Sequence, residues 1–399
     1  MRALVTGVAG FVGSHLAETL LARGDEVLGV DCFTPYYAAA DKERNLSVAR
    51  GNSRFAFVDA DLRSAAIEPL LDGVDVVFHQ AAQAGVRLSW SGGFADYVGH
   101  NVLATQRLLE AVQHARPNAR VVYASSSSVY GNQARYPTVE TDLPKPFSPY
   151  GVTKLAAEHL CGLYAENSGV HTVALRYFTV FGPRQRPDMS IHRLCRAAID
   201  GTQFPRYGDG TQIREFTFVR DIVAGNLAAA DGDAPPGTYA NLAGGGEVTL
   251  NELIALVGDL AGAPVAIDAG PKMAGDSFRN GGAIDRAREH GELHGGFKAV
   301  AESLERVVAG QGLVKFGAAG DEFDPRFHEA LMHRHSAEVT TTTAGEVISS
   351  GYKIGERVVR PAQVVAVDPE PELSPRSEED QQAGTSVATG GEDHGEEDV

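Results

Sequence analysis

Apolar positions in the first 245 residues fall into short runs that alternate with longer segments of helical period. The short runs predict strands, because they are three to five residues long and most contain β-branched side chains: Ala3–Val5, Glu26–Val30, Val74–Phe78, Arg120–Tyr123 and Thr172–Leu175. Leucines and valines recur every three or four residues in Phe11–Arg23 and Val102–His114, which predicts helices. Alternating apolar strands and helices predict an α/β fold, a doubly wound parallel sheet covered on both faces.

The pattern changes beyond residue 245. Thr249–Leu260 predicts a further helix, and the periodicity then breaks down around 271–282. A charged helical segment follows at 285–312, and a small β-rich piece occupies 320–367. We therefore expect a domain boundary between Gly281 and Asp285, which divides the chain into 1–282 and 284–367.

Negative charge is concentrated at the C-terminal end. Residues 368–399 contain eleven acidic residues and one arginine, so they hold −10 of the net charge of −17. This tail has several prolines and no apolar period, which predicts a disordered segment that favours solubility. An acidic chain is also a poor partner for nucleic acid, because phosphates repel it.

Composition narrows the environment of the protein. The longest apolar runs among the 399 residues are of strand length, so no membrane span is expected. The N-terminus shows no basic region followed by an apolar stretch, which argues against a secretory signal. Cys32, Cys161 and Cys195 are odd in number and lack metal-ligand spacing. We expect a cytoplasmic protein without a metal site.

A glycine-rich turn lies where the first predicted strand meets the first predicted helix. Gly7, Gly10 and Gly13 would let the backbone approach a pyrophosphate at a helix N-terminus, although glycines in such a place can also serve the turn alone. Asp31 ends the second predicted strand, where a carboxylate accepts hydrogen bonds from a ribose 2′-hydroxyl and repels a 2′-phosphate. The order of these features favours NAD binding.

A second group of residues has the pattern of a proton-transfer site. Tyr150 and Lys154 are four residues apart, so they share a helix face, and a neighbouring ammonium is expected to lower the pKa of the phenol. The serine run 125–128 follows a predicted strand and would lie at the carboxyl edge of the sheet, where ligands bind. Such a tyrosine can take a proton from a sugar or alcohol hydroxyl.

Together these segments resemble the extended short-chain dehydrogenases/reductases, and among them the UDP-glucuronate and UDP-glucose 4-epimerases. The matching motifs are T-G-V-A-G-F-V-G-S at Thr6–Ser14, D-A-D-L-R at Asp59–Arg63, H-Q-A-A-Q-A-G-V-R at His79–Arg87, S-S-S-S-V-Y-G at Ser125–Gly131, Y-G-V-T-K at Tyr150–Lys154, R-Y-F-T-V-F-G-P-R-Q-R-P-D-M at Arg176–Met189 and R-E-F-T-F-V-R-D-I-V at Arg214–Val223. The resemblance implies a Rossmann-type domain at 1–282 with a small substrate lobe, mainly 180–215 and 235–282.

The resemblance also implies a catalytic triad of Ser126, Tyr150 and Lys154, with Ser127 as the alternative serine. Tyr150 would deprotonate the sugar 4-hydroxyl while hydride passes to NAD⁺, and Lys154 would bind the nicotinamide ribose. The 4-keto sugar would then turn over and take the hydride back on its other face. Further NAD contacts are implied for Gly7, Gly10, Phe11, Val12, Gly13, Asp31, Asp61, Leu62, Ala81, Ala82 and Gln83.

For the substrate, the resemblance implies contacts from Ser126, Ser127 and Tyr150. It places Arg214 on the diphosphate, and Arg186 is a candidate for a uronate carboxylate, since arginine binds such groups with a bidentate fork. Thr179 stands where many glucose epimerases have Asn, which favours the uronate branch. A homodimer through the helices at 102–114 and 150–166 is implied as well.

Dehydratases and uronate decarboxylases of the same family are less consistent with this sequence. They resemble it but carry an acidic residue directly after the catalytic serine or threonine. Here the next positions are Ser127, Ser128 and Val129. Because dehydration needs that acid at the neighbouring carbon, we favour epimerisation.

The region 284–367 resembles a different family, GrpE, the nucleotide exchange factor of Hsp70 chaperones. D-R-A-R-E-H-G-E-L-H-G-G-F-K-A-V-A-E-S-L-E at Asp285–Glu305 is similar to its helical bundle, and F-D-P-R-F-H-E-A-L-M at Phe323–Met332 and G-Y-K-I-G-E-R-V-V-R-P-A at Gly351–Ala362 are similar to its β-domain. Arg357 matches a position that contacts the chaperone.

The junction lacks parts of both families. The long dimerising helix of GrpE and the closing helix of the epimerase substrate lobe have no counterpart, so the chain looks like a fusion of two truncated genes. Three hypotheses follow: a UDP-sugar 4-epimerase with a GrpE-like region, an Hsp70 exchange factor with an inactive epimerase part, or a catalytically inactive protein that binds NAD or a partner.

Overall fold

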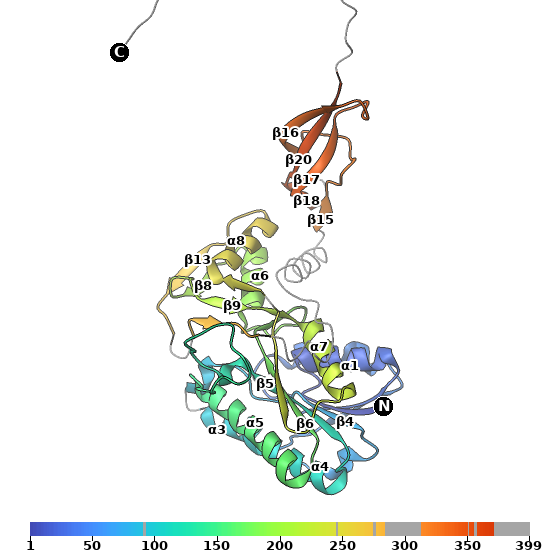
Figure 1. Cartoon of the computed structure of the whole chain (residues 1–399), viewed down its shortest axis with the longest axis vertical. Coiled ribbons are helices and arrows are strands. Elements are labelled where there is room, and N and C mark those ends of the chain that lie inside the picture. The colour runs from blue at the N-terminus through green and yellow to red at the C-terminus, as the bar shows by residue number, and fades with distance from the viewer. Residues whose placement is uncertain are drawn as a thin grey trace, which may run out of the picture. The chain divides into compact units, whose positions relative to one another are not determined.

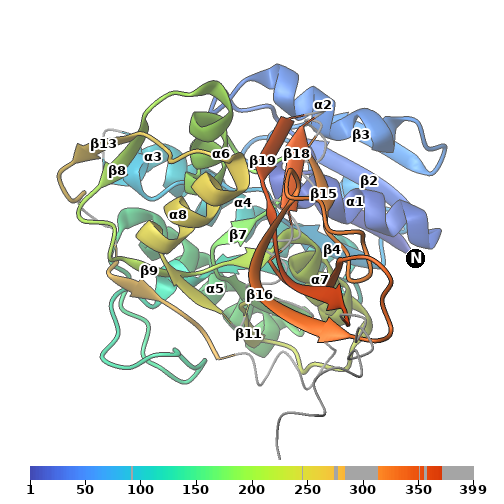
Figure 2. The ribbon, with the colours of Figure 1, turned by 90° about the horizontal axis from the view of Figure 1, so that it is seen from above.

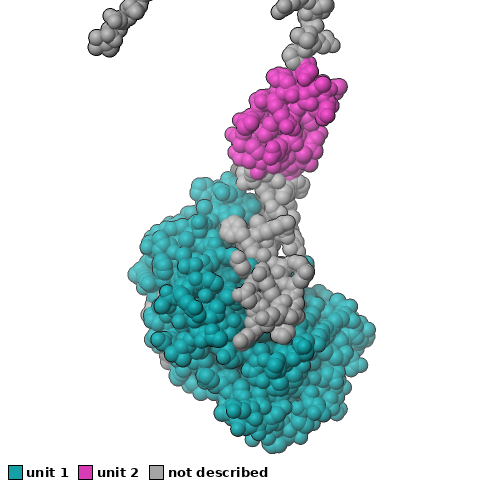
Figure 3. Space-filling model, viewed as in Figure 1, with its two compact units in different colours: residues 1–313 teal, residues 314–399 magenta. Residues whose placement is uncertain are grey.

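The chain forms two compact units, Met1–Leu313 and Val314–Val399 (Figure 3). The computed structural model describes residues 1–90, 93–244, 246–273, 277–283, 313–349, 351–354 and 357–370. The predicted helix at 285–312 and most of the predicted acidic tail lie outside these residues. The division between the units falls later in the sequence than the boundary expected at Gly281–Asp285.

A seven-stranded parallel sheet forms the centre of the first unit, with the strand order β11-β6-β5-β4-β1-β2-β3. Its strands are β1 (Arg2–Thr6), β2 (Glu26–Asp31), β3 (Phe55–Asp59), β4 (Val76–His79), β5 (Arg120–Ser126), β6 (Thr172–Tyr177) and β11 (Thr238–Leu242). The order reverses direction next to β1, which is the switch point where such sheets bind ligands. The predicted α/β, Rossmann-type fold is confirmed.

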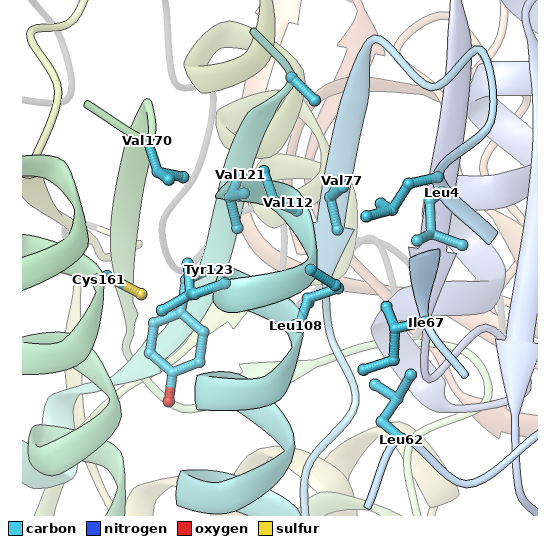
Figure 4. Close-up of a cluster of buried hydrophobic side chains, with 14 of the residues drawn as sticks. Leu4, Leu62, Ile67, Val77, Leu108, Val112, Val121, Tyr123, Cys161 and Val170 are labelled. Atoms are coloured by element: carbon cyan, nitrogen blue, oxygen red, sulfur yellow. The ribbon is translucent and has the colours of Figure 1, made fainter. Parts of the chain in front are cut away.

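Helices cover both faces of this sheet (Figure 1). Helix α1 (Phe11–Arg23) packs against α2 (Ala39–Arg50) and α7 (Val219–Asp231), and α4 (Ala104–Ala115) packs against α5 (Pro149–Ser168). The leucines and valines of α4 meet the apolar side chains of the strands, as Figure 4 shows for Leu108, Val112, Val77 and Val121. No helix of the described residues combines the length and apolarity that crossing a bilayer requires.

The predicted helix at Val102–His114 begins earlier and in another form. Residues Val98–Leu103 form a π-helical segment, η3, that follows the short α3 (Phe94–Tyr97) and leads into α4. Asn101 in η3 is buried and bonds the Gln83 backbone and the Thr153 hydroxyl. The Thr105 hydroxyl donates to the Asn101 carbonyl, so side-chain bonds replace part of the regular helical pattern.

A small lobe completes the first unit. It contains α6 (Ser190–Asp200), α8 (Leu250–Ala261) and short strand pairs, and it lies at the opposite end from α2 and β3 (Figure 2). The strands are β7 (Val180–Phe181) with β10 (Thr217–Phe218), β8 (Phe204–Tyr207) with β13 (Ile267–Gly270), and β9 (Ile213–Glu215) between β12 (Glu247–Thr249) and β14 (Arg279–Asn280). Helix α8 begins with a reciprocal capping box between Thr249 and Glu252.

The second unit is built from strands. Strand β20 (Ala362–Pro369) lies between β16 (His328–Ser336), which runs parallel to it, and β17 (Thr343–Ser349), which runs antiparallel. A second small sheet contains β15 (Leu313–Phe316), β18 (Gly351–Ile354) and β19 (Arg357–Arg360). The core holds Ala344, Ala362 and Val364 with Phe316 and Phe323 packed against them.

Candidate active site

One large cleft opens at the carboxyl ends of the central strands, between the sheet and the small lobe. Its volume is about 880 Å³. All the site residues predicted for the first unit line it: Gly7, Gly10, Phe11, Val12, Gly13, Asp31, Asp61, Leu62, Ala81, Ala82, Gln83, Ser126, Ser127, Tyr150, Lys154, Thr179, Arg186 and Arg214. The fold therefore brings together residues that are more than 200 positions apart in sequence.

The glycine turn forms a cradle that side chains would fill. Gly7 has a φ of +67°, and a Cβ there would lie 2.7 Å from the Ala81 nitrogen. A Cβ on Gly13 would collide with the Gly7 carbonyl oxygen. Helix α1 starts at Phe11, and its first residues, Phe11 and Val12, line the cleft, so the N-terminus of the helix borders it. This arrangement fits the pyrophosphate of a dinucleotide.

Two carboxylates lie near the end of the cleft formed by β2 and β3. Asp31 accepts hydrogen bonds from the backbone nitrogens of Ala9 at 3.1 Å and Phe33 at 2.9 Å. Asp61 is paired with Arg63, whose hydrogen bonds hold the pKa of that carboxyl below its ordinary value. Asp31 is fixed in place at the strand end, where the ribose of a dinucleotide would lie.

A cluster of three side chains near this end of the cleft, one of them Asp61, could not be predicted from sequence spacing. The side chains of Cys32, Asp61 and His100 come from separate segments, and their potential metal-ligating atoms all lie within 4.8 Å of one another. The same residues line the cleft. Asp61 is paired with Arg63, and together with Cys32 and His100 it forms part of the cleft lining near β2 and β3.

Tyr150 faces the cleft from the first turn of α5, whose N-cap is Ser148. Burial raises the pKa of its phenol, and two groups oppose that effect: a hydrogen bond with Ser126 and the positive charge of Arg186. Ser126 is the last residue of β5 and accepts a hydrogen bond from the Ser128 nitrogen. The phenol and the serine hydroxyl thus meet at the carboxyl edge of the sheet.

Lys154 lies buried in the cleft wall and is bonded to the backbone of β5. Its ammonium is only 3% exposed and donates a 2.7 Å hydrogen bond to the Ala124 carbonyl. Burial lowers the pKa of Lys154 to about 7. In this structure the positive charge that opposes the rise of the tyrosine pKa is that of Arg186, and the expectation that Lys154 lowers this pKa stays a prediction.

Arg186 is held by a neighbour that the motifs did not single out. Its guanidinium bonds both carboxylate oxygens of Asp188 at 3.0 Å and lies over the Tyr36 ring. The Tyr36 hydroxyl donates to the same Asp188. Arg186, Asp188 and Tyr36 line the same cleft as Tyr150. Asp188 therefore fixes the position of the Arg186 guanidinium and neutralises part of its charge, and Arg186 still acts on the pKa of Tyr150.

Arg214 and Ser127 both contact the short segment 277–283. Arg214 donates to the carbonyls of Ser277 at 2.8 Å and Phe278 at 3.3 Å. The Ser127 hydroxyl accepts a 2.9 Å hydrogen bond from the Asn280 amide. Thr179 lines the same part of the cleft, and its carbonyl accepts a bond from the Thr217 nitrogen. The sequence placed residues 277–282 in the substrate lobe, but its irregular apolar pattern singled out none of their side chains.

A buried ion pair fixes the elements behind the catalytic residues. Glu158 on α5 pairs with Arg176 on β6, and both are less than a tenth exposed. Glu158 also accepts a 2.7 Å hydrogen bond from Ser125, the neighbour of Ser126. One helix turn beyond Lys154, this network ties α5 to β5 and β6, so the tyrosine and serine are carried on elements joined by buried bonds.

Arg357 belongs to the second unit. It is the first residue of β19, where it pairs with Ile354 of β18. Its part in a partner contact therefore stays a prediction.

The parallel sheet, the glycine cradle and the Ser–Tyr–Lys group in one cleft define a dinucleotide-binding protein of the Rossmann type. The model of the NAD dependent epimerase/dehydratase family matches residues 3–243, so the chain belongs to that family. The GrpE family model matches residues 274–367. Both resemblances inferred from the motifs are confirmed.

Known relatives cover most of the first unit. An uncharacterized UDP-glucose epimerase of Bacillus subtilis is 40% identical over 290 residues, which span 72% of this chain and 91% of that protein. A UDP-glucuronate 4-epimerase of Thermodesulfobacterium geofontis is 36% identical over 65% of this chain and 80% of its own length. The structure of the Bacillus cereus UDP-glucuronic acid 4-epimerase with UDP-glucuronic acid and NAD is similar with a TM-score of 0.72, at 37% identity, covering 77% of this chain and all of that one.

Proposed function

We propose that the first unit is an NAD-dependent UDP-sugar 4-epimerase that acts on UDP-glucuronate or UDP-glucose. The observation that carries this proposal is the meeting of Tyr150, Ser126 and Lys154 in the same cleft as the glycine cradle. The similar Bacillus cereus structure, whose whole length is covered, contains UDP-glucuronic acid and NAD. The absence of an acidic residue among Ser127, Ser128 and Val129 favours epimerisation over dehydration.

The residues of the cradle would hold the cofactor. Gly7, Gly10 and Gly13 leave room for the pyrophosphate, and Asp31 would accept hydrogen bonds from the adenosine ribose. Asp61, Leu62, Ala81, Ala82 and Gln83 would line the adenine end and the middle of the cofactor. When bound, NAD⁺ would accept a hydride from C4 of the sugar and return it to the opposite face.

Tyr150 would take the proton of the sugar 4-hydroxyl. In its buried position the phenol needs stabilisation of its anionic form, which Ser126 and Arg186 provide by a hydrogen bond and by charge. The Lys154 ammonium would stay on the side of the Ala124 carbonyl, where it can bond a ribose hydroxyl. Arg214 would bind the diphosphate, and Thr179, Ser127 and Arg186 would surround the sugar.

Substitution of Tyr150 by Phe tests the mechanism. We expect Tyr150→Phe to lower kcat for the interconversion of UDP-glucuronate and UDP-galacturonate by about 10²–10⁴-fold, because it removes the proton acceptor. The cofactor should remain bound, as measured by absorbance after purification.

Tyr164→Phe is the matched control, because Tyr164 lies on the same helix and accepts only a hydrogen bond from Gln106 among the described contacts. Its activity should be unchanged. Unchanged turnover in Tyr150→Phe would remove the proposed mechanism. A wild-type protein that epimerises neither UDP-uronates nor UDP-hexoses would overturn the function itself.

A second candidate function belongs to the C-terminal unit. The match of the GrpE model to residues 274–367 and the compact β-structure from Val314 onward favour an interaction with an Hsp70 chaperone. We infer that the β-domain docks on the chaperone through a surface that includes Arg357. In that case the chain would accelerate nucleotide release, alone or in addition to epimerisation.

We also propose that the first unit forms a homodimer through α4, α5 and the adjoining η3. Val152 and Leu163 on α5 are 50% and 55% exposed, and they are eleven positions apart, which amounts to about three helix turns, so they lie on one face. Leu103 at the end of η3, which packs against α5, is 46% exposed. Apolar side chains gathered in this way are typical of an interaction surface.

A further inference from the structure

We propose that Asn280 is a specificity-determining residue that contacts the sugar of the nucleotide-sugar substrate, with its amide oxygen accepting a hydrogen bond from a sugar hydroxyl. This inference rests on the proposed function and deepens it. Asn280 belongs to β14, only a few residues before the end of the described part of the first unit, and it lines the cleft. Neither the motifs nor the glycine cradle involves this residue.

The position of Asn280 relative to the chemistry is set by a chain of hydrogen bonds. The Asn280 amide nitrogen donates to the Ser127 hydroxyl at 2.9 Å. Ser127 directly follows Ser126, which lies beside the Tyr150 phenol and opposes the rise in its pKa. Since Tyr150 is the proposed acceptor of the 4-hydroxyl proton, Asn280 lies at the sugar end of the cleft and not at the end formed by β2 and β3.

The amide oxygen of Asn280 has no hydrogen-bond partner among the described residues and is closed to solvent. A sugar hydroxyl reaches this oxygen once the amide turns toward the cleft that Asn280 lines. A shielded acceptor without a partner costs about 1–3 kcal/mol, and a donor from the ligand removes that cost. A sugar hydroxyl is such a donor, whereas a carboxylate can only accept.

The backbone around Asn280 is held from two sides, so the segment that carries the side chain is positioned in advance. β14 pairs with β9 through Arg279 and Ile213, and Asn280 and Arg214. On the other side, the Thr138 nitrogen donates to the Gly281 carbonyl at 2.8 Å, and the Gly282 nitrogen donates to Glu215 at 2.6 Å. Preorganised contacts of this kind contribute to discrimination between ligands because little ordering remains to be done on binding.

Arg279 adds a further anchor. Its guanidinium pairs with Glu247 and lies 5.0 Å from the centre of the Tyr136 ring. The GrpE model match begins at residue 274 and so includes this segment, yet the structure joins residues 277–283 to the first unit. The segment that family comparison assigns to the second region therefore contributes a side chain to the site of the first.

Substitution of Asn280 by Asp tests the proposal in the full-length protein. The new carboxylate loses the N–H that donates to Ser127 and can only accept from the Ser127 hydroxyl, and it adds a negative charge beside the sugar. We expect Asn280→Asp to weaken binding of UDP-glucuronate at least about tenfold more than binding of UDP-glucose, and to change the Kd of UDP by less than about twofold. Asn280→Ala should weaken UDP-glucose several-fold and leave UDP unchanged. Isothermal titration calorimetry provides all these values without turnover.

Asn167→Asp is the charge-matched control, because Asn167 lies exposed near the end of α5 and bonds only the Leu163 carbonyl among the described contacts. It should leave every Kd unchanged. Equal losses for UDP and for both UDP-sugars in Asn280→Asp, or no loss at all, would overturn the role of Asn280. A wild-type protein that binds UDP-sugars without epimerising them would contradict only the proposed activity, and one that binds no UDP-sugar would overturn both proposals.

Discussion

At the scale of single residues, the environment of each group decides its chemistry. Tyr150 is surrounded by protein, which raises the pKa of its phenol, and the opposing effects come from Ser126 and Arg186. Lys154 is buried enough for its pKa to fall to about 7. Besides the lysine four residues further along the helix, an arginine from a distant loop therefore supplies positive charge to the tyrosine.

Gly13 gives a prediction at this scale. A Cβ at Gly13 would meet three backbone atoms of the same turn, among them the Gly7 carbonyl oxygen and the Val8 Cα at 3.0 Å, so the turn must shift. We expect Gly13→Ala to weaken NAD binding at least about tenfold, equivalent to about 1.4 kcal/mol, as measured by fluorescence titration.

Gly162 on α5 is the control, because a Cβ there meets no atom within 4 Å. Gly162→Ala should keep the NAD affinity and raise the free energy of unfolding by about 0.5–1 kcal/mol, since alanine favours the helix. An unchanged affinity in Gly13→Ala would show that the turn does not hold the cofactor.

At the scale of elements, α5 combines three tasks. Its N-terminal turn carries Tyr150 and Lys154 into the cleft, and its middle carries Glu158 into the buried pair with Arg176. Its outer face exposes Val152 and Leu163. An interface on this face would place a second protomer against the helix that holds the catalytic tyrosine, so assembly and catalysis share an element.

The proposed dimer makes a prediction at this scale. We expect the wild type to have the mass of a dimer in multi-angle light scattering, and the double variant Val152→Glu/Leu163→Glu to have the mass of a monomer, because charges on an apolar interface prevent its burial. Ile199→Glu is the control, since Ile199 is 49% exposed on α6 in the small lobe. A wild type that stays monomeric at high concentration would contradict the proposed interface.

At the scale of the whole molecule, two units of different ancestry share one chain. The first contains the parallel sheet and the cleft, and the second contains only strands in its described part. The two family matches are separate, at 3–243 and 274–367, but the structure joins residues 277–283 to the first unit. The GrpE match therefore begins well before the structural division at Leu313, and it includes residues 277–283, which line the cleft or contact residues of the first unit.

The second unit leads to a prediction for the full chain. Added to an Hsp70 loaded with fluorescent ADP, the protein is expected to accelerate ADP release, and Arg357→Glu is expected to abolish the acceleration by reversing the charge at the proposed contact. Arg196→Glu is the control, because Arg196 is 64% exposed on α6 of the first unit. A release rate that stays at the level of the chaperone alone would exclude the exchange function for this chain.

Much of the fold follows from local pattern. Phe11–Arg23 has the same bounds in sequence and structure, because its apolar stripe, its glycine before the first turn and Gly24 in a left-handed conformation after the last one are all local signals. The helix expected at Val102–His114 was only partly right, because the side-chain bonds of Asn101 with Gln83 and Thr153 favour a π-helical segment. Those bonds join residues distant in sequence, which periodicity does not detect.

For the site, the sequence by itself determined which residues are candidates for the chemistry. The glycines, Asp31, the serine run and the Tyr150–Lys154 pair could be predicted to line the cleft, because their spacing along one strand or helix fixes their placement. Tertiary structure alone decided their state. The pairing of Arg186 with Asp188, the bond of Lys154 to Ala124 and the contact between Asn280 and Ser127 depend on which chain segments meet. Burial and long-range hydrogen bonds determine the pKa values of these groups and decide which acceptors lack a partner. Both depend on contacts between segments distant in sequence, as between Asn280 and Ser127, which are 153 positions apart and 2.9 Å from each other.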